Sequence, residues 1–228
     1  MRRPLAAATL TLAALALGAC GSTNKPASTA APSVATSPSG ACAKAAQHAA
    51  KGPQHLQKPT LRLDPAKRYT ARLQTSCGEI DISLDVRRAP KTAASFVYLA
   101  RKRFFDGLTF HRVSRAPDGT PFVIQGGDPL GTGEGGPGYQ VVERPPASLR
   151  YTHGVVAMAK TQTDPPGASG SQFFIVSGAD AGLPPDYALL GQVSAGDAVV
   201  AKVARVQTDA NERPLQPVVI EHVTITTP

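Results

Sequence analysis

The stretch Phe105-Asp106-Gly107-Leu108-Thr109-Phe110-His111-Arg112-Val113 shows how this chain is built. A glycine precedes a short run of alternating residues at 108–113, a pattern that is typical of a β-strand. Strand alternation should turn Phe110 into the core and His111 to the opposite face. Arg112 is a poor core residue, because an Arg flanked by apolar strand residues is seldom buried without a partner. We therefore expect this strand to expose a functional side chain.

Similar short runs recur on both sides of this strand, each bounded by Gly, Pro, Asp or Ser. A helical stretch opens at Pro90 and should end near Arg103, and Gly196-Asp197 opens a second one. Because closure is how a long β chain avoids exposed edges, we expect an all-β-dominated fold, a closed eight-stranded antiparallel β-barrel with two helices. The eight expected strands are residues 68–73, 79–84, 108–113, 122–125, 155–159, 173–176, 189–193 and 218–225.

The composition agrees with one folded domain that is rich in turns. The 228 residues suffice for one domain of ordinary size plus appendages. Hydrophobic residues make up 42% and charged residues 18%, which permits a buried core and excludes wholesale disorder. With 21 Gly, 21 Pro and no Trp, short strands and turns are favoured over a helical bundle.

The first twenty residues indicate export. Met1-Arg2-Arg3 is a basic start, and residues 5–17 form an apolar run that is too short to span a bilayer comfortably. We therefore predict a signal peptide at residues 1–19. The sequence Leu17-Gly18-Ala19-Cys20 resembles the bacterial lipobox, which predicts a lipid on Cys20. The alternative is a chance cysteine after a plain signal peptide.

The residues that follow are expected to tether a folded domain to the membrane. Residues 22–40 are almost entirely Ser, Thr, Ala, Pro and Gly, a composition that cannot bury a core. We assign residues 20–60 to the lipid-anchor cysteine and a flexible tether, and residues 61–228 to the domain. This arrangement places the protein on the outer face of the cytoplasmic membrane.

The cysteine count predicts one disulfide. If Cys20 carries lipid, Cys42 and Cys77 remain, and two thiols in an oxidising exterior are usually bridged. Metal binding by two isolated cysteines is a poor alternative, because none of the five histidines has H-x-x-x-H or H-x-H spacing. We therefore expect no metal site.

Charge and short motifs exclude several classes of function. The net charge of +8 suits anionic lipid headgroups and wall polymers, and no basic run interleaved with aromatic residues indicates nucleic-acid binding. Residues 131–136 fit the dinucleotide fingerprint G-x-G-x-x-G, but Pro137-Gly138 follows where a helix is required, so a glycine loop is expected. Residues 167–171 lack the second glycine of a G-x-S-x-G nucleophile motif.

Four segments in one order resemble the signatures of the cyclophilin family of peptidyl-prolyl isomerases. They are residues 105–113, 122–129, 154–159 and 170–176, and the resemblance covers about residues 69–225. It implies an eight-stranded antiparallel barrel capped by two helices, with the active groove on the outside of the barrel. It also implies isomerase activity without a cofactor on proline-containing peptides, by a chain that we expect to be a monomer.

The same resemblance implies roles for individual residues. The catalytic residues would be Arg112, Phe122 and Gln125. The substrate-binding residues would be Val123, Ala159, Lys160, Gln172, Phe174, Leu183 and Tyr187. The chain departs from the family pattern where Lys160 replaces an Asn, Gly182 a Trp common in eukaryotic members, and Tyr187 a His.

The chemistry explains why these residue types are needed. An X–Pro bond is held planar by resonance and rotates over a barrier of roughly 18–20 kcal/mol. A guanidinium hydrogen-bonded to the prolyl nitrogen would stabilise the twisted state over the planar state, while an apolar groove grips the proline ring. We expect the protein to assist the folding of exported proteins in this way. The alternative is a catalytically weak proline-peptide-binding chaperone or adaptor that uses the same groove.

Overall fold

The structure, a computed structural model, describes residues 42–45 and 50–227. The predicted signal peptide, Cys20 and residues 20–41 of the predicted tether lie outside these described residues. Among the helices that are described, none is long and apolar enough to cross a membrane.

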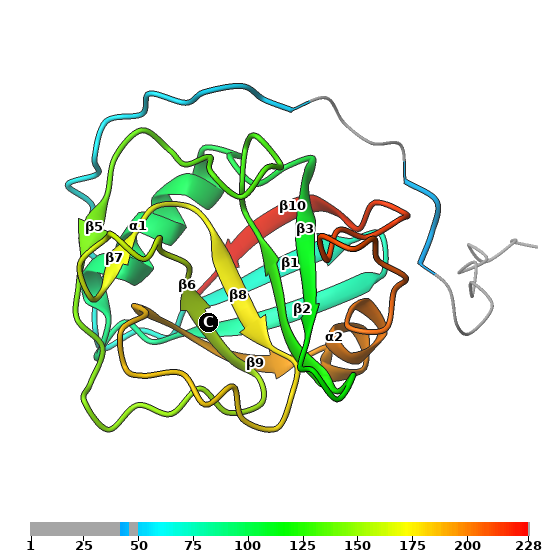
Figure 1. Cartoon of the computed structure of the whole chain (residues 1–228). Helices are drawn as coiled ribbons and strands as arrows, with labels where there is room; N and C mark the ends of the chain where they lie inside the picture. Colours follow the sequence, from blue (N-terminus) through cyan, green and yellow to red (C-terminus); the bar gives the residue numbers. More distant parts are fainter. Residues whose placement is uncertain (1–41, 46–49, 228) are drawn as a thin grey trace, which may run out of the picture. The chain divides into compact units, whose positions relative to one another are not determined.

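Eight antiparallel strands close into a barrel in the order β1-β10-β3-β4-β8-β6-β9-β2 (Figure 1). The predicted eight-stranded barrel is confirmed, and each predicted strand overlaps an observed one. The strands are β1 Thr70–Thr75, β2 Gly78–Leu84, β3 Leu108–Arg115, β4 Pro121–Gly126, β6 Val155–Met158, β8 Phe173–Val176, β9 Leu189–Ala195 and β10 Val219–Thr226.

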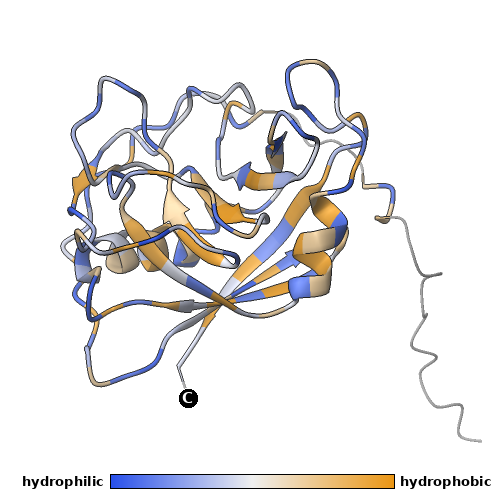
Figure 2. Ribbon diagram, turned by 60° about the horizontal axis from the view of Figure 1, so that its bottom comes forward, coloured by the Kyte–Doolittle hydropathy of each residue, from blue (hydrophilic) through white to orange (hydrophobic). Residues whose placement is uncertain are grey.

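The barrel interior is filled by apolar side chains. Phe110 and Phe173 are fully buried, as strand alternation predicts, and their ring centroids lie 6.0 Å apart in an edge-to-face arrangement. Phe96 contributes a third ring, 5.7 Å from Phe173. Figure 2 shows hydrophobic stretches along the strands, while hydrophilic stretches are frequent in the connecting loops.

Two helices accompany the barrel, as predicted. Helix α1 spans Pro90–Arg101 and begins with a proline, whose missing N–H costs nothing in the first turn. The N-cap residue, Ala89, has no side chain that could accept a hydrogen bond from the first turn. Instead, the carboxylate of Glu143 accepts hydrogen bonds from the Lys91 and Thr92 backbone N–H groups. Helix α2 spans Asp197–Val203 and is shorter.

A second, two-stranded sheet lies outside the barrel. It pairs β5 (Val141–Val142) with β7 (Ala168–Ser169) and was not predicted. Two residues are too few to show a period-two pattern, so the sequence offers no signal for either strand. Glu143 directly follows β5, so this sheet places the Glu143 carboxylate at the N-terminus of α1.

The segment before the barrel is attached to it. A disulfide joins Cys42 to Cys77, with their Cα atoms 4.2 Å apart. Residues 50–60, which fall within the predicted tether, contain no helix or strand. They nevertheless contact the domain, as where the Leu56 N–H donates to the carbonyl oxygen of Pro137 at 2.8 Å.

Candidate active site

A β-bulge in β3 sets the direction of Arg112. Phe110 lies opposite Gly126 and Arg112 lies opposite Gln125, so two steps along β3 match one step along β4. The extra residue is His111. In a regular strand that lacked this bulge, residues 110 and 112 would share a face, because side chains alternate along a strand. The bulge therefore lets Phe110 fill the core while Arg112 points outward.

A row of paired residues crosses four strands on the outer face. Arg112 pairs with Gln125, Gln125 with Phe174, and Phe174 with Ala157. Directly paired residues point to the same side of a sheet. The neighbouring row, Val113, Ile124, Ile175 and Val156, is almost fully buried and faces the core. The predicted groove residues are thus on the outside of the barrel.

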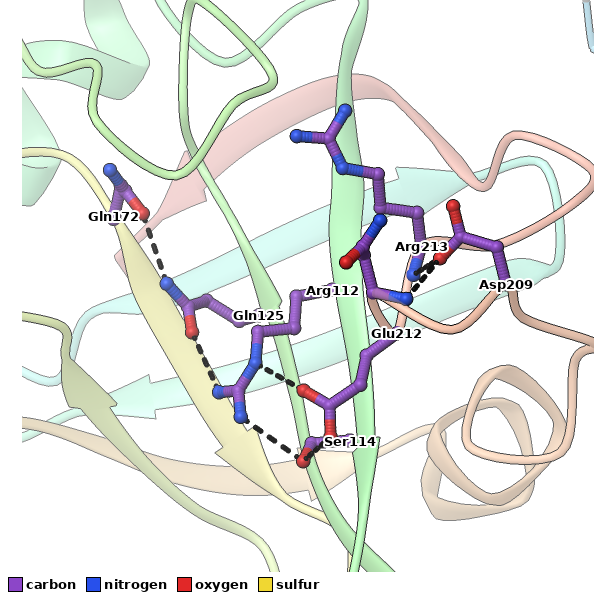
Figure 3. A network of polar contacts seen from close by, with 8 residues as sticks. Arg112, Ser114, Gln125, Gln172, Asp209, Glu212 and Arg213 are labelled. Carbon is purple, nitrogen blue, oxygen red and sulfur yellow. Dashed lines mark hydrogen bonds and ion pairs between the residues drawn. The ribbon is translucent and has the colours of Figure 1, made fainter.

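Three acceptors from different parts of the chain hold the Arg112 guanidinium (Figure 3). Nε donates to Glu212 Oε2 at 2.6 Å, Nη1 to Gln125 Oε1 at 3.3 Å, and Nη2 to Ser114 Oγ at 3.1 Å. A guanidinium has five N–H donors, so one on Nη1 and one on Nη2 stay without a partner among the described residues. The Arg112 side chain as a whole is 39% exposed.

Glu212 is delivered by a tight turn before β10. The Asp209 carboxylate accepts hydrogen bonds from the backbone N–H groups of Asn211 and Arg213, and Glu212 itself has a positive φ of 62°. The Glu212 carbonyl accepts the Val113 N–H at 2.8 Å, which fixes the turn beside β3. Sequence reasoning missed this residue, since it lies 100 positions from Arg112 and no motif marks it.

Two glutamines connect the guanidinium to the glycine loop. Arg112 can only donate, so the Gln125 oxygen faces it and the Gln125 Nε2 donates to Gln172 Oε1 at 3.0 Å. Gln172 Nε2 then donates to the carbonyls of Gly133 and Gly135, each at 2.8 Å. The loop at 131–136 contains no helix, as expected. We call the series of hydrogen bonds from Arg112 through Gln125 and Gln172 to this loop the relay.

The predicted apolar residues gather in one cluster on the outer face. Val123 and Phe174 are buried in it, and four others pack against it while remaining partly exposed: Phe122, Ala159, Leu183 and Tyr187. The Phe174 and Tyr187 rings meet edge to face with centroids 5.5 Å apart. The structure therefore brings these six predicted residues together beside Arg112.

Tyr151 supports this surface from beneath and was not predicted. Its side chain is fully buried, and its hydroxyl donates to the Tyr187 carbonyl at 2.6 Å while accepting the Tyr187 N–H at 3.0 Å. Burial raises the pKa of Tyr151 to about 12, so the hydroxyl stays protonated. The contact holds Tyr187 in place at the edge of the cluster.

The bulge residue His111 is buried next to the site. Neither of its ring nitrogens has a hydrogen-bond partner among the described residues, and the residue is 8% exposed. Burial lowers the pKa of His111, although the nearby Asp128 carboxylate opposes this effect. The imidazole is therefore neutral near pH 7 and adds no second cation beside Arg112.

An open pocket of about 720 Å³ continues from the relay. Gln125, Gln172, Ala159 and Lys160 line it. The Lys160 ammonium donates to the carbonyls of Thr161 and Asp164, both at 3.2 Å, and lies 5.6 Å from the centre of the Tyr187 ring. The predicted binding residues Lys160 and Gln172 are thus placed on one wall of a pocket beside the apolar cluster.

The arrangement combines an anchored cation with an adjoining apolar surface. The guanidinium of Arg112 carries only N–H donors, so it can only donate hydrogen bonds. Within the described residues no group of three or more His, Cys, Asp or Glu side chains could hold a metal ion. Such a site suits the binding and electrostatic stabilisation of a neutral, partly apolar group.

Known proteins share this fold and these motifs. The model of the family described as cyclophilin type peptidyl-prolyl cis-trans isomerase/CLD matches residues 70–225. The chain is 39% identical over 179 residues to peptidyl-prolyl cis-trans isomerase A of Mycobacterium tuberculosis, covering 71% of this chain and 94% of that protein. It is also 39% identical over 181 residues to peptidyl-prolyl cis-trans isomerase B of Streptomyces anulatus, covering 71% and 99%.

A solved structure agrees. The crystal structure of a cyclophilin type isomerase from Cryptosporidium parvum matches with a TM-score of 0.63 and 27% sequence identity, covering 70% of this chain and 98% of that chain. Because the family model spans well over half of the sequence and the barrel is the same, this chain belongs to the cyclophilin-type peptidyl-prolyl cis-trans isomerase family and is an enzyme of that class.

Proposed function

We propose that Arg112 accelerates rotation about X–Pro bonds by donating a hydrogen bond to the prolyl nitrogen. The observation that carries this proposal is the guanidinium beside the apolar cluster, which three acceptors hold while two N–H groups stay without a partner among the described residues. As the peptide bond twists, the nitrogen loses resonance and exposes a lone pair, which the planar ground state lacks. A donor that binds the twisted state more strongly than the planar state lowers the barrier.

The apolar cluster supplies the second half of this mechanism. Phe122, Val123 and Phe174 would take the proline ring, and Leu183 would close the groove. Excluding water around the ring strengthens the hydrogen bond from Arg112, because the local dielectric constant falls. Rotation needs no covalent intermediate, so these contacts are sufficient chemistry for the reaction.

The test is the Arg112→Ala variant, with Arg112→Lys as its matched control. A protease-coupled assay on a short X–Pro peptide should show a loss of about a hundredfold for Arg112→Ala, equivalent to roughly 2.7 kcal/mol. Lys keeps the charge but cannot reach Gln125, Ser114 and Glu212 together, so Arg112→Lys should recover only part of the activity. Circular dichroism should show both variants folded. Wild-type activity in Arg112→Ala would reject the mechanism.

The competing function, a catalytically weak peptide-binding module, is less well supported. The anchored guanidinium has no evident use in simple binding of an apolar ring. Binding of proline peptides without measurable turnover in the same assay would favour the module. Proline-containing peptides are the proposed partners in either case, and the Cryptosporidium parvum isomerase was also crystallised in the presence of the dipeptide Ala-Pro.

We also propose that the enzyme works outside the cytoplasmic membrane on exported proteins, as a lipid-anchored monomer. The support is the lipobox-like sequence ending at Cys20, the Ser- and Pro-rich stretch after it, and a net charge of +8, or +6 once Arg2 and Arg3 leave with the signal peptide, that suits anionic headgroups. Mass spectrometry of membrane-extracted protein should find an acylated Cys20, and Cys20→Ser should release the protein from membranes. An unmodified Cys20 would reject the anchor without affecting the assignment of Arg112.

A further inference from the structure

A segment that precedes the family match runs along the edge of the site. We call residues 50–60 the strap. Near its start, the Lys51 N–H donates to the Pro129 carbonyl at 2.9 Å, and further along the Leu56 N–H donates to the Pro137 carbonyl at 2.8 Å. Both acceptors belong to the long loop that carries the glycines of the relay. The strap therefore follows this loop across residues 51–56.

The Lys51 side chain fixes the start of the strap. Its ammonium donates to the carbonyls of Phe104 at 2.8 Å and Arg103 at 3.2 Å, in the turn that follows α1. Burial lowers the pKa of Lys51, although the nearby Asp106 carboxylate opposes this effect. A charged group is desolvated at a cost that only specific hydrogen bonds offset. The strap is thus anchored and does not merely rest on the surface.

The loop leaves room for the strap backbone. A Cβ atom added to Gly138 would lie 2.5 Å from the carbonyl oxygen of Gln54 and 2.7 Å from the Cα atom of His55. Gly138 also has a positive φ of 91°, where side chains are disfavoured. This glycine permits the two backbones to approach closely.

The strap forms part of the wall of the pocket beside the catalytic groove. Pro53 and Gln54 line the same 720 Å³ space as Gln125, Gln172 and Lys160. A peptide bound with its proline on the apolar cluster would place a flanking residue next to this pocket. Residues outside the barrel thereby join residues of the relay in one binding surface.

The polar groups of the pocket offer acceptors more than donors. Gln54 Nε2 donates to the carbonyls of Lys51 and Gly52, so its Oε1 is left without a partner among the described residues. Gln140 Nε2 donates to Asp164 Oδ1, which leaves the Gln140 Oε1 also without a partner among the described residues. Glu134 adds a negative charge at the rim.

Lys160 is the one cation among the described residues that line the pocket, and the carboxylates of Glu134 and Asp164 outnumber it there. The Lys160 ammonium donates to two backbone carbonyls, those of Thr161 and Asp164. An incoming side chain therefore meets carboxylate and amide oxygens, which accept hydrogen bonds. The complementary groups are an ammonium or a guanidinium.

We propose that the strap completes a specificity subsite that takes the Lys or Arg side chain of a residue flanking the substrate proline. This proposal rests on the proposed function, since the peptide is placed by the groove beside Arg112. Gln54 is the residue through which the strap acts, because it lines the pocket and its Nε2 holds the strap's own backbone, which leaves Oε1 without a partner among the described residues. The positive net charge, +8 for the full sequence and +6 without the signal peptide, favours acidic peptides at long range, so a preference for a basic residue must come from local contacts.

The test uses proline peptides in which one residue at a time, on either side of the proline, is Lys, Ala or Glu. Both kcat/KM and peptide affinity by fluorescence anisotropy are measured, at about 0.15 M salt to screen distant charges. At one position the wild type should prefer Lys over Glu by about fivefold, as expected for a partly exposed charge contact. Gln54→Lys should reduce this preference to below about twofold, and Gln54→Glu should increase it.

His55→Lys is the matched control, because His55 is the exposed neighbour of Gln54 and does not line the pocket. It should leave the preference unchanged. The subsite is rejected if the wild type shows no position with a Lys preference, if Gln54→Lys keeps it, or if His55→Lys removes it equally. Affinity measured on Arg112→Ala separates this proposal from the mechanism: the Lys preference should persist in binding when turnover is lost.

Discussion

Glu212 offers the sharpest test of how Arg112 is positioned. Replacing it in a Glu212→Ala variant removes the acceptor that lies 2.6 Å from Arg112 Nε and leaves Gln125 and Ser114 as the remaining partners. Ser114 also loses a partner, since its Oγ donates to Glu212 Oε1. The variant therefore loosens the guanidinium without touching the apolar cluster.

Two effects of opposite sign determine the result. Loss of the ion pair frees the guanidinium to rotate; both side chains are more than a third exposed, so the pair contributes about 1 kcal/mol. Loss of the carboxylate also raises the positive potential at Arg112. That gain acts only on the partial charge of the prolyl nitrogen, so it is smaller than the loss of orientation. The net expectation is a decrease in kcat of about fivefold.

The assay compares kcat and KM for one X–Pro peptide across three variants. Glu212→Ala should lower kcat with KM changed by less than about twofold, because proline binding depends on the apolar cluster. Glu212→Gln keeps an acceptor for Nε and should restore most of the activity. Glu221→Ala removes the same charge from an exposed position on β10 and should behave as wild type.

Three outcomes would refute this reasoning. A kcat equal to or above that of the wild type in Glu212→Ala would show that Glu212 mainly weakens the cation. A change in KM alone would place Glu212 in substrate binding. An equal loss in Glu221→Ala would mean that net charge, and not position, controls the rate.

Three further predictions concern stability and inhibition. Burial lowers the pKa of His111, so the unfolded chain takes up a proton at a higher pH than the folded protein does. As the pH drops below the unfolded-state pKa of about 6.5, the free energy of unfolding of the wild type should therefore fall relative to that of His111→Leu. Urea titrations at pH 8 and pH 5 that give the same difference between the two proteins would contradict this. Cys42→Ser should cost about 3–4 kcal/mol in the same titration, because the disulfide to Cys77 closes a loop with a sequence separation of 35; an unchanged midpoint would show that the strap is held without it. Cyclosporin, a macrocycle that the cyclophilin family is known for binding, should inhibit weakly, since Gly182 stands where many eukaryotic members have a Trp and offers no aromatic side chain; inhibition as tight as for a Trp-containing member would contradict this.

The barrel could be predicted because its strands carry local signals. Short apolar or alternating runs, most of them bounded by Gly, Pro, Asp or Ser, mark all eight barrel strands, and the proline at position 90 marks the start of α1. The β5 and β7 strands carry no such signal, since two residues form no pattern. Their pairing depends on the fold around them, which brings together positions 141 and 169.

The site could be predicted only in part. The motifs identify Arg112 and the apolar residues of the groove, and the structure brings them together. Simple alternation would place Phe110 and Arg112 on one face, and no local pattern reveals the bulge at His111 that separates them. Glu212 and Tyr151 act through partners 100 and 36 positions away, distances at which a single sequence carries no information on contact.

The placement of the supporting groups shows how the Arg112 guanidinium can be held in place and still have N–H groups left for the proposed hydrogen bond. Its acceptors come from β3, β4 and the turn before β10, so no single local movement releases the guanidinium. Because the barrel holds these acceptors in position before substrate arrives, little reorganisation is needed when the prolyl nitrogen becomes a hydrogen-bond acceptor. Gln125 also donates to Gln172, and Gln172 donates to the glycine loop, against which the strap lies. A change in the strap should therefore alter which peptide binds, whereas a change in Glu212 should alter how fast the bound peptide rotates.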